Sequence, residues 1–299
     1  MSLTQVLPPS CTTPVTQAKG RYFSWWLVVF AAGWLAVLLV AFPHPTTLMQ
    51  RHWPLILVGV GGAILGNATA VGGGLVFVPV MIVIYHLPAE AALKLALATQ
   101  AFGMTSGAIA WLRRGVVPTE ALSATAPALL IGATVGTVIV APSSLLVKGI
   151  FGPASILIGL TTLLMLNRSG SRSGMPRRAT FPLVLVTLGG GLLTGWIAIG
   201  VGEVVAAFLM VVYGLRIERC VGLGVVLLAI GSIYLTLLHQ VIAHDIPWDM
   251  AIFTILGAVF GARSAPFLTS YLSPRTLKLG FAAIAIVDGL IFVVQSHLG

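Results

Sequence analysis

Long apolar segments, separated by short polar breaks, extend over almost the whole chain. Residues 1–20 are mostly polar, and the first apolar run covers residues 25–42. This run is longer than the apolar core of a cleavable signal peptide, so it predicts an uncleaved first transmembrane helix. Ten further apolar segments each predict a helix, at residues 54–71, 73–87, 89–112, 119–141, 144–166, 181–199, 202–215, 217–240, 247–268 and 274–294.

A polar linker at residues 167–180 divides these ten segments into two sets of five. The two sets share short motifs in the same order, which predicts that one set is a duplicate of the other. Each match alone is weak in a chain rich in glycine and alanine, but the common order supports duplication. The matched pairs are AVGGG (70–74) with GVGE (200–203), IGATVG (131–136) with LGAVFG (256–261), AP (141–142) with AP (265–266), and KGIF (148–151) with KLGF (278–281).

The second segment of each set is short for a membrane crossing. Residues 73–87 and 202–215 fall below the roughly 20 residues that a transmembrane helix needs. Each follows a glycine cluster, so we expect the first two segments of each set to form a helical hairpin, or two broken helices, near the membrane midplane. Each set then crosses the membrane an odd number of times, so the second set starts on the opposite side from the first. The two sets are therefore inverted relative to each other.

The predicted fold is therefore an all-α polytopic membrane protein with two inverted repeats. Each repeat has a glycine-broken helical hairpin and three transmembrane helices, and one extra N-terminal helix precedes them. The expected divisions are 1–53 for the N-terminal tail and first helix, 54–166 for repeat 1, 167–180 for a basic cytoplasmic linker and 181–299 for repeat 2. Secondary transporters have this architecture, with the substrate at the repeat interface.

Composition and charge support the membrane class. The chain is 58% hydrophobic and 8% charged, whereas a soluble domain carries about 25% charged residues. A net charge of +9 would indicate nucleic-acid binding in a soluble protein. Here most basic residues lie in loops. If each successive helix crosses the membrane, these loops fall on the same side. This asymmetry follows the positive-inside rule, so we expect a cytoplasmic N-terminus and linker, and no nucleic-acid partner.

The two glycine clusters are the leading candidates for substrate binding. Gly72, Gly73 and Gly74 precede one short helix, and Gly200 and Gly202 precede the other. A helix start has unpaired backbone N–H groups and a positive dipole end, and glycine lets the backbone approach a ligand closely. Two such starts facing each other would form an anion site. The alternative is that these glycines only allow close helix packing.

Polar side chains in the same segments could complete the site. Their hydroxyl and amide groups can donate hydrogen bonds to oxyanions. The alternative for each is a hydrogen bond to a neighbouring helix or to its own helix. The candidates are Asn67, Thr69, Thr99, Gln100 and Ser232, with Thr105, Ser106 and Tyr234 in the same segments.

Glu203 is the most informative single residue, because it is a carboxylate inside the second glycine cluster. An intramembrane carboxylate is costly to bury and is a functional candidate by default. Burial disfavours its charged form, so it could carry a proton and couple proton movement to substrate movement. Two alternatives remain open: a structural ion pair with a cation such as Arg263, or a side chain that reaches water.

No enzymatic, cofactor or metal chemistry is predicted. The chain contains no phosphate-binding loop, dinucleotide fingerprint, zinc-protease helix or nucleophile elbow. His239 and His244 lie near Asp245 and Asp249, but in a polar loop that offers no further ligand, whereas zinc needs three or four. We therefore predict no catalytic residue, no cofactor and no metal.

Four stretches of the chain resemble the TauE/SafE sulfite exporter family. They are GNATAVGGGLVFVP (66–79), KLALAT (94–99), residues 195–203 and GAVFG (257–261), and the likeness covers about residues 54–296. The resemblance implies an inner-membrane permease for small sulfur-containing or organic anions such as sulfite or sulfonates, with export as the direction. It implies a binding role for the five glycines of the two clusters. The chain departs from the family pattern at Ala70 and at Glu203, where glycine is expected.

The leading hypothesis is a secondary transporter that exports a small anion, with proton coupling through Glu203 as an option. The alternative is a cation-coupled permease or channel-like protein in which Glu203 binds the cation. A third class, a membrane enzyme or sensor, would need a catalytic cluster, and the sequence shows none. The expected partners are the small anion and membrane lipid, and the sequence leaves a homodimer open.

Overall fold

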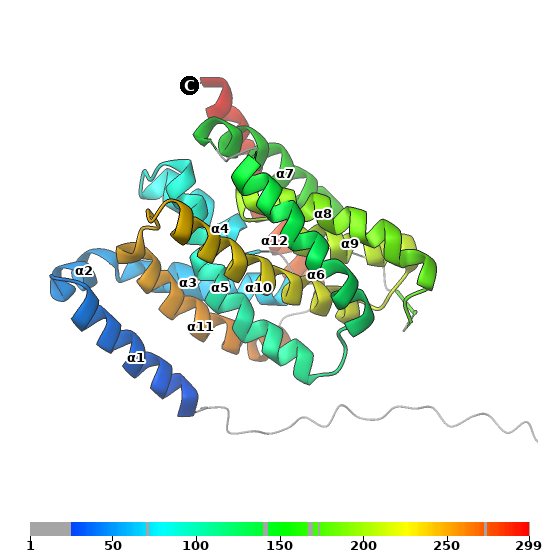
Figure 1. Ribbon diagram of the computed structural model, residues 1–299, viewed down its shortest axis with the longest axis horizontal. Helices are drawn as coiled ribbons and strands as arrows, with labels where there is room; N and C mark the ends of the chain where they lie inside the picture. Colours follow the sequence, from blue (N-terminus) through cyan, green and yellow to red (C-terminus); the bar gives the residue numbers. More distant parts are fainter. Residues whose placement is uncertain are drawn as a thin grey trace, which may run out of the picture.

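The computed structural model describes residues 25–69, 72–139, 143–166, 170–172, 174–271 and 274–298 (Figure 1). The predicted N-terminal tail, Ala70 and part of the linker lie outside these residues. The described chain is all-helical and has no β-strand. Its α-helices are α1 Trp25–Ala41, α2 Pro45–His52, α3 Pro54–Thr69, α4 Gly74–Pro79, α5 Ala89–Arg113, α6 Thr119–Thr134, α7 Ser144–Leu164, α8 Thr180–Ile197, α9 Val201–Tyr213, α10 Ile217–Ile242, α11 Trp248–Tyr271 and α12 Pro274–Leu298.

Every predicted apolar segment contains a helix, so the hydrophobic pattern located the elements correctly. Two features escaped it. Helix α2 is short and polar, with the sequence PTTLMQRH, and it meets α1 at a bend of 120°. The chain also widens into π-helix at Val80–Ile84 after α4 and at Val135–Ile139 after α6. A hydrophobic pattern does not report either feature, because neither changes which positions are apolar.

The described helices identify a membrane protein. Five are long and apolar enough to cross a bilayer, and a sixth span results if the bent pair α1 and α2 counts as one. Large apolar side chains face outward, for example Val40 at 88% exposure and Leu145 at 85%. Such exposure is unfavourable in water and is expected where lipid is the solvent. The five spans are Ala89–Arg113, Thr119–Ile139, Val147–Leu164, Thr180–Ile197 and Ile217–Ile242.

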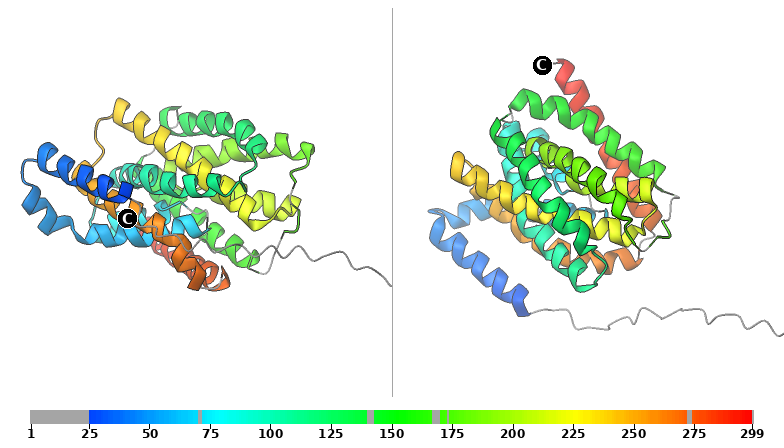
Figure 2. Two further views of the ribbon diagram at one scale, coloured as in Figure 1. Left: turned by 90° about the horizontal axis from the view of Figure 1, so that it is seen from below. Right: turned by 45° about the vertical axis from the view of Figure 1, so that its right-hand side comes forward.

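The main helix contacts join the first half of the chain to the second. Helix α3 packs against α11, and α6 packs against α8. Helix α5 packs against α10, and α7 packs against α12. Figure 2 shows the result, in which segments far apart in the sequence are interleaved in one helical bundle. The core is therefore shared by both halves.

Glycines allow these helices to approach closely. A Cβ atom at Gly257 of α11 would overlap the carbonyl oxygen of Ile56 in α3, and one at Gly132 of α6 would overlap that of Leu188 in α8. Small residues at such contacts are how membrane helices pack without a hydrophobic driving force between them. The GxxxG pairs in residues 132–136 and 257–261 therefore serve packing.

Candidate functional site

Two interruptions of the helical backbone meet inside the bundle. The first is the glycine cluster between α3 and α4, and the second is the segment from Ala198 to Gly200 between α8 and α9. A Cβ atom at Gly74 would lie 2.6 Å from the carbonyl oxygen of Ala198, and one at Gly72 would lie 3.1 Å from the same oxygen. The two backbones are thus in direct contact. We call this contact, formed by residues 72–74 and 198–203, the crossing.

The second interruption depends on an unusual backbone. Ala198 adopts a left-handed conformation with φ of 56°, and Gly200 has φ of 135°. The Gly200 conformation is open to glycine and strained for other residues. The chain can therefore turn sharply between α8 and α9, so that Gly200 caps the start of α9.

The carboxylate of Glu203 joins the two interruptions. One oxygen, Oε1, accepts a hydrogen bond from the N–H of Gly72 at 2.7 Å, and Oε2 accepts one from the N–H of Gly200 at 2.9 Å. The bond to Gly200 is the N3-to-N-cap half of a capping box, and the bond to Gly72 spans the two halves of the chain. The residue is buried at 8% exposure. The crossing therefore holds a carboxyl group on N–H groups from both halves.

Neutral polar side chains surround the crossing. Gln100 of α5 is buried and donates from Nε2 to the carbonyl oxygen of Ala198 at 2.9 Å. Ser232 of α10 donates weakly to Oε1 of Gln100, at 3.5 Å. Gln100 and Ser232, both predicted from sequence, thus lie beside the two interruptions.

Thr194 is a residue of this region that the sequence analysis missed. Its hydroxyl accepts a hydrogen bond from the N–H of Val201 at 3.1 Å and donates to the carbonyl oxygen of Gly190 at 2.8 Å. It therefore satisfies an N–H group at the start of α9. A threonine seven positions before a helix has no capping signature, so the sequence carried no signal for it.

Not every predicted glycine is part of the contact between the backbones. A Cβ atom at Gly73 would meet the ring of Phe77, which lies one helical turn further along the same chain segment. Gly202 is buried in the first turn of α9. The residues at the contact itself are Gly72, Gly74 and Ala198. Gly200 is linked to Gly72 through the side chain of Glu203.

Thr99 lies against α11 and not at the crossing. Its hydroxyl donates to the carbonyl oxygen of Leu95 and lies 2.5 Å from the hydroxyl of Thr254. Thr99 therefore hydrogen-bonds to its own helix and to a neighbouring helix, which was the alternative to a role in substrate binding.

Asn67 packs in the contact between α3 and α5. Its Nδ2 donates to the carbonyl oxygen of Ala63 at 2.9 Å, and its Oδ1 is buried against Gly107 without a described partner. The side chain of Thr69 lies outside the described part of the chain. Neither residue is placed at the crossing by a described contact.

No ion pair neutralises Glu203 within the described residues. Arg263, the cation considered as its partner, lies with its guanidinium 5.7 Å from the centre of the Trp26 ring. Groups of three His, Cys, Asp or Glu side chains, as a metal site would need, are also absent from the described chain. The carboxylate is held by backbone dipoles instead.

A second cross-half contact lies at the end of α10. Lys94 of α5 donates from Nζ to Oδ2 of Asp245 at 2.5 Å, and the Lys94 side chain is 9% exposed against 55% for Asp245. The hydrogen bond from Lys94 holds the pKa of the Asp245 carboxyl below its usual value. This contact is an ordinary ion pair between opposite charges.

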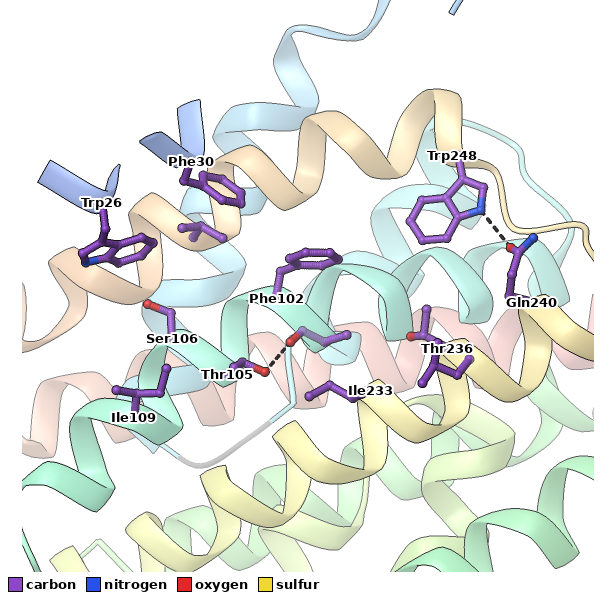
Figure 3. A pocket seen from close by; sticks show the side chains of 13 residues that line it. Trp26, Phe30, Phe102, Thr105, Ser106, Ile109, Ile233, Thr236, Gln240 and Trp248 are labelled. Atoms are coloured by element: carbon purple, nitrogen blue, oxygen red, sulfur yellow. Dashed lines mark hydrogen bonds between the residues drawn. The ribbon is translucent and has the colours of Figure 1, made fainter. Parts of the chain in front are cut away.

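A cavity of about 460 Å³ lies between α1, α5, α10 and α11. Figure 3 shows Trp26 and Phe30 of α1 near one end, and Trp248 at the other end, where its indole donates to Gln240 at 2.9 Å. Thr105 and Ser106, named above as polar candidates, line this cavity. Its wall is largely apolar and includes no residue of the crossing. The hydroxyls of Thr105 and Thr236 in this wall donate to carbonyl oxygens of their own helices.

One comparison with known proteins agrees with the resemblance seen in the sequence. A family model described as Sulfite exporter TauE/SafE matches residues 55–292, which is most of the chain. No curated protein and no solved structure gives a significant match. The chain belongs to the TauE/SafE sulfite exporter family of membrane transporters.

Proposed function

We propose that this protein is a secondary transporter that exports a small sulfur-containing or organic anion, such as sulfite or a sulfonate, through the crossing. The observation that carries the proposal is the carboxylate bound by the N–H groups of Gly72 and Gly200. Sulfite and sulfonates are oxyanions, as a carboxylate is. Donors that bind one of these groups at a helix start suit the others.

The helix contacts support a two-fold relation between the halves. Exchanging the halves turns the contact of α3 with α11 into the contact of α8 with α6, and both contacts occur. The contacts of α5 with α10 and of α7 with α12 are each unchanged by the exchange. Two repeats related by a two-fold axis give this pattern, and in transporters built from inverted repeats the substrate binds at the interface between the repeats.

Orientation and direction complete the proposal. The basic residues favour a cytoplasmic N-terminus and linker, in an inner membrane. Export is taken from the family, because the geometry of the site is compatible with movement either way. The cation-coupled alternative is less favoured, because both oxygens of Glu203 face hydrogen-bond donors and neither faces a cation ligand set.

The test is flux through the purified full-length protein in liposomes. Vesicles are loaded with sulfite, methanesulfonate, sulfate or chloride, each with the same counter-ion. They are then diluted into a medium that lacks the loaded anion. We expect saturable efflux of sulfite or methanesulfonate above that of protein-free vesicles. Efflux that follows the sodium gradient whichever anion is present would contradict the proposal and select the cation-coupled alternative.

A further inference from the structure

The anion-binding donors of the crossing are already occupied by a group of the protein itself. The two N–H groups that would receive a substrate oxyanion are those that hold Glu203. We propose that the Glu203 carboxylate is a tethered anion that occupies the substrate position, and that substrate binds only when this carboxylate takes up a proton and leaves. This inference rests on the proposed anion site and specifies how it opens.

Occupancy follows from the hydrogen bonds. Each oxygen of the carboxylate has its own donor, one from each half of the chain, and the side chain is buried. A substrate oxyanion cannot use the same N–H groups while the carboxylate keeps them. Binding of substrate is therefore a replacement of one anion by another.

The neighbourhood explains why the replacement needs a proton. The side chains that α5, α8 and α10 bring to the crossing are Gln100, Thr194 and Ser232, which bond to Ala198, Val201 and Gln100 respectively. None of the three titrates or carries a charge. No ion-pair partner is present among the described residues. Two negative charges in this buried, uncompensated environment repel each other strongly. A proton on Glu203 removes the repulsion and keeps the charge of the site at one.

The same exchange links binding to the contact between the halves. The bond from Gly72 to Glu203 connects residues that are 131 positions apart in the chain. When the carboxylate leaves, this cross-half bond is replaced by bonds to the substrate. When the substrate leaves, the deprotonated carboxylate returns and the two interruptions are joined again.

The experiment measures proton uptake during anion binding. Methanesulfonate is the probe, because it stays ionised over the whole working range and any proton change belongs to the protein. Its binding to the detergent-solubilised full chain is followed by calorimetry from about pH 6 to about pH 9, with a pH dye in weakly buffered solution. We expect uptake of about one proton per anion and an affinity that falls about tenfold per pH unit where the free carboxyl is ionised.

Two variants assign the proton to Glu203. Glu203→Gln keeps an oxygen that can accept from the backbone but removes the charge, so we expect binding without proton uptake and without pH dependence. Asp288→Asn is the matched control, since it removes a partly buried carboxyl of α12 that makes none of the hydrogen bonds around Glu203. It should keep the proton uptake and pH dependence of the wild type.

The possible failures are distinguishable. Methanesulfonate or sulfite binding to the wild type without proton uptake, or uptake that persists in Glu203→Gln, would overturn the tethered anion and leave the anion site standing. Absence of binding by any anion to every variant would overturn both proposals. If Glu203→Gln does not fold, the proton uptake of the wild type decides the question alone.

Discussion

Two carboxylates of the second half of the chain reach residues of the first half, and they do so in different ways. Glu203 is buried, and its oxygens accept hydrogen bonds from the neutral N–H groups of Gly72 and Gly200. Asp245 is half exposed, and its partner is the ammonium group of Lys94. The first contact joins a carboxyl group to neutral backbone donors, whereas the second pairs two opposite charges.

Because of this difference, we expect the partner of Gly72 and Gly200 to be replaceable by another anion, and the pair of Lys94 and Asp245 to stay together. Backbone N–H groups bind any oxyanion of suitable size, so the partner of Gly72 and Gly200 is replaceable. Lys94 is largely buried, and a buried ammonium group without a counter-ion is costly. Its contact with Asp245 is therefore expected to persist while the crossing opens and closes.

The largest effect is expected from forcing the two interruptions apart. In Gly74→Val the new side chain would collide with the backbone of Ala198, which cannot rotate away. We expect anion efflux from liposomes to fall to the level of protein-free vesicles, measured at equal amounts of reconstituted protein. Gly61→Val in α3 is the matched control, because no atom lies within 4 Å of its Cβ position. Equal flux in both variants would contradict the crossing as the site.

A smaller effect is expected from straining the turn without filling the contact. Gly200→Ala places a side chain where φ is 135°, and strain of this kind costs about 1–3 kcal/mol. We expect the free energy of unfolding in detergent to fall by about that amount, measured by circular dichroism during denaturant titration. Gly189→Ala in α8 is the control: no atom lies within 4 Å of its Cβ position and alanine favours the helix, so this variant should lose no stability. If the two variants are equally stable, the turn is not strained by a side chain.

The smallest effect is expected at the ion pair of Lys94 and Asp245. Because the hydrogen bond from Lys94 lowers the pKa of Asp245 in the folded protein, the pair stabilises it above the usual aspartate range and less as pH falls below about 4. The half-exposed position of Asp245 limits the contribution to about 1 kcal/mol or less. The measurement is the midpoint of thermal unfolding in detergent, at about pH 7 and at about pH 2.5, below the usual aspartate range.

Asp245→Asn tests the same contact at constant pH. We expect it to lower the unfolding midpoint near neutral pH and to weaken the acid dependence. Glu218→Gln is its control, since it removes an exposed carboxylate that lies 3.6 Å from Arg216 on the surface. A larger loss in Glu218→Gln than in Asp245→Asn would mean that the pair with Lys94 does not hold the halves together.

Much of the fold could be predicted because apolar segments and glycine clusters are local features of the chain. The predicted helix at residues 217–240 appears as α10, and Gly72 of the first cluster is joined to the second cluster by the side chain of Glu203. Helix α2 was missed because it is only eight residues long, is mostly polar and ends in Arg51 and His52. The hydrophobic pattern predicts a helix well only where the helix is buried in lipid or protein, because burial is what requires apolar residues.

The candidate site was predicted less completely. Gln100 and Ser232 were named from their polarity, and both lie at the crossing. Thr99 was named for the same reason and pairs with Thr254 instead. Polarity inside an apolar segment shows that a side chain needs a partner, but the rotation of the helix about its axis decides which partner it meets.

The sequence by itself determined the membrane class, the positions of the helices, the two glycine interruptions and the family. These depend on composition and on neighbours along the chain. Only the tertiary structure decided that Glu203 binds Gly72, which is 131 residues away, and that Thr194 supports the start of α9. Contacts over such distances depend on how helices pack and rotate, because packing sets which backbone donors a side chain can reach.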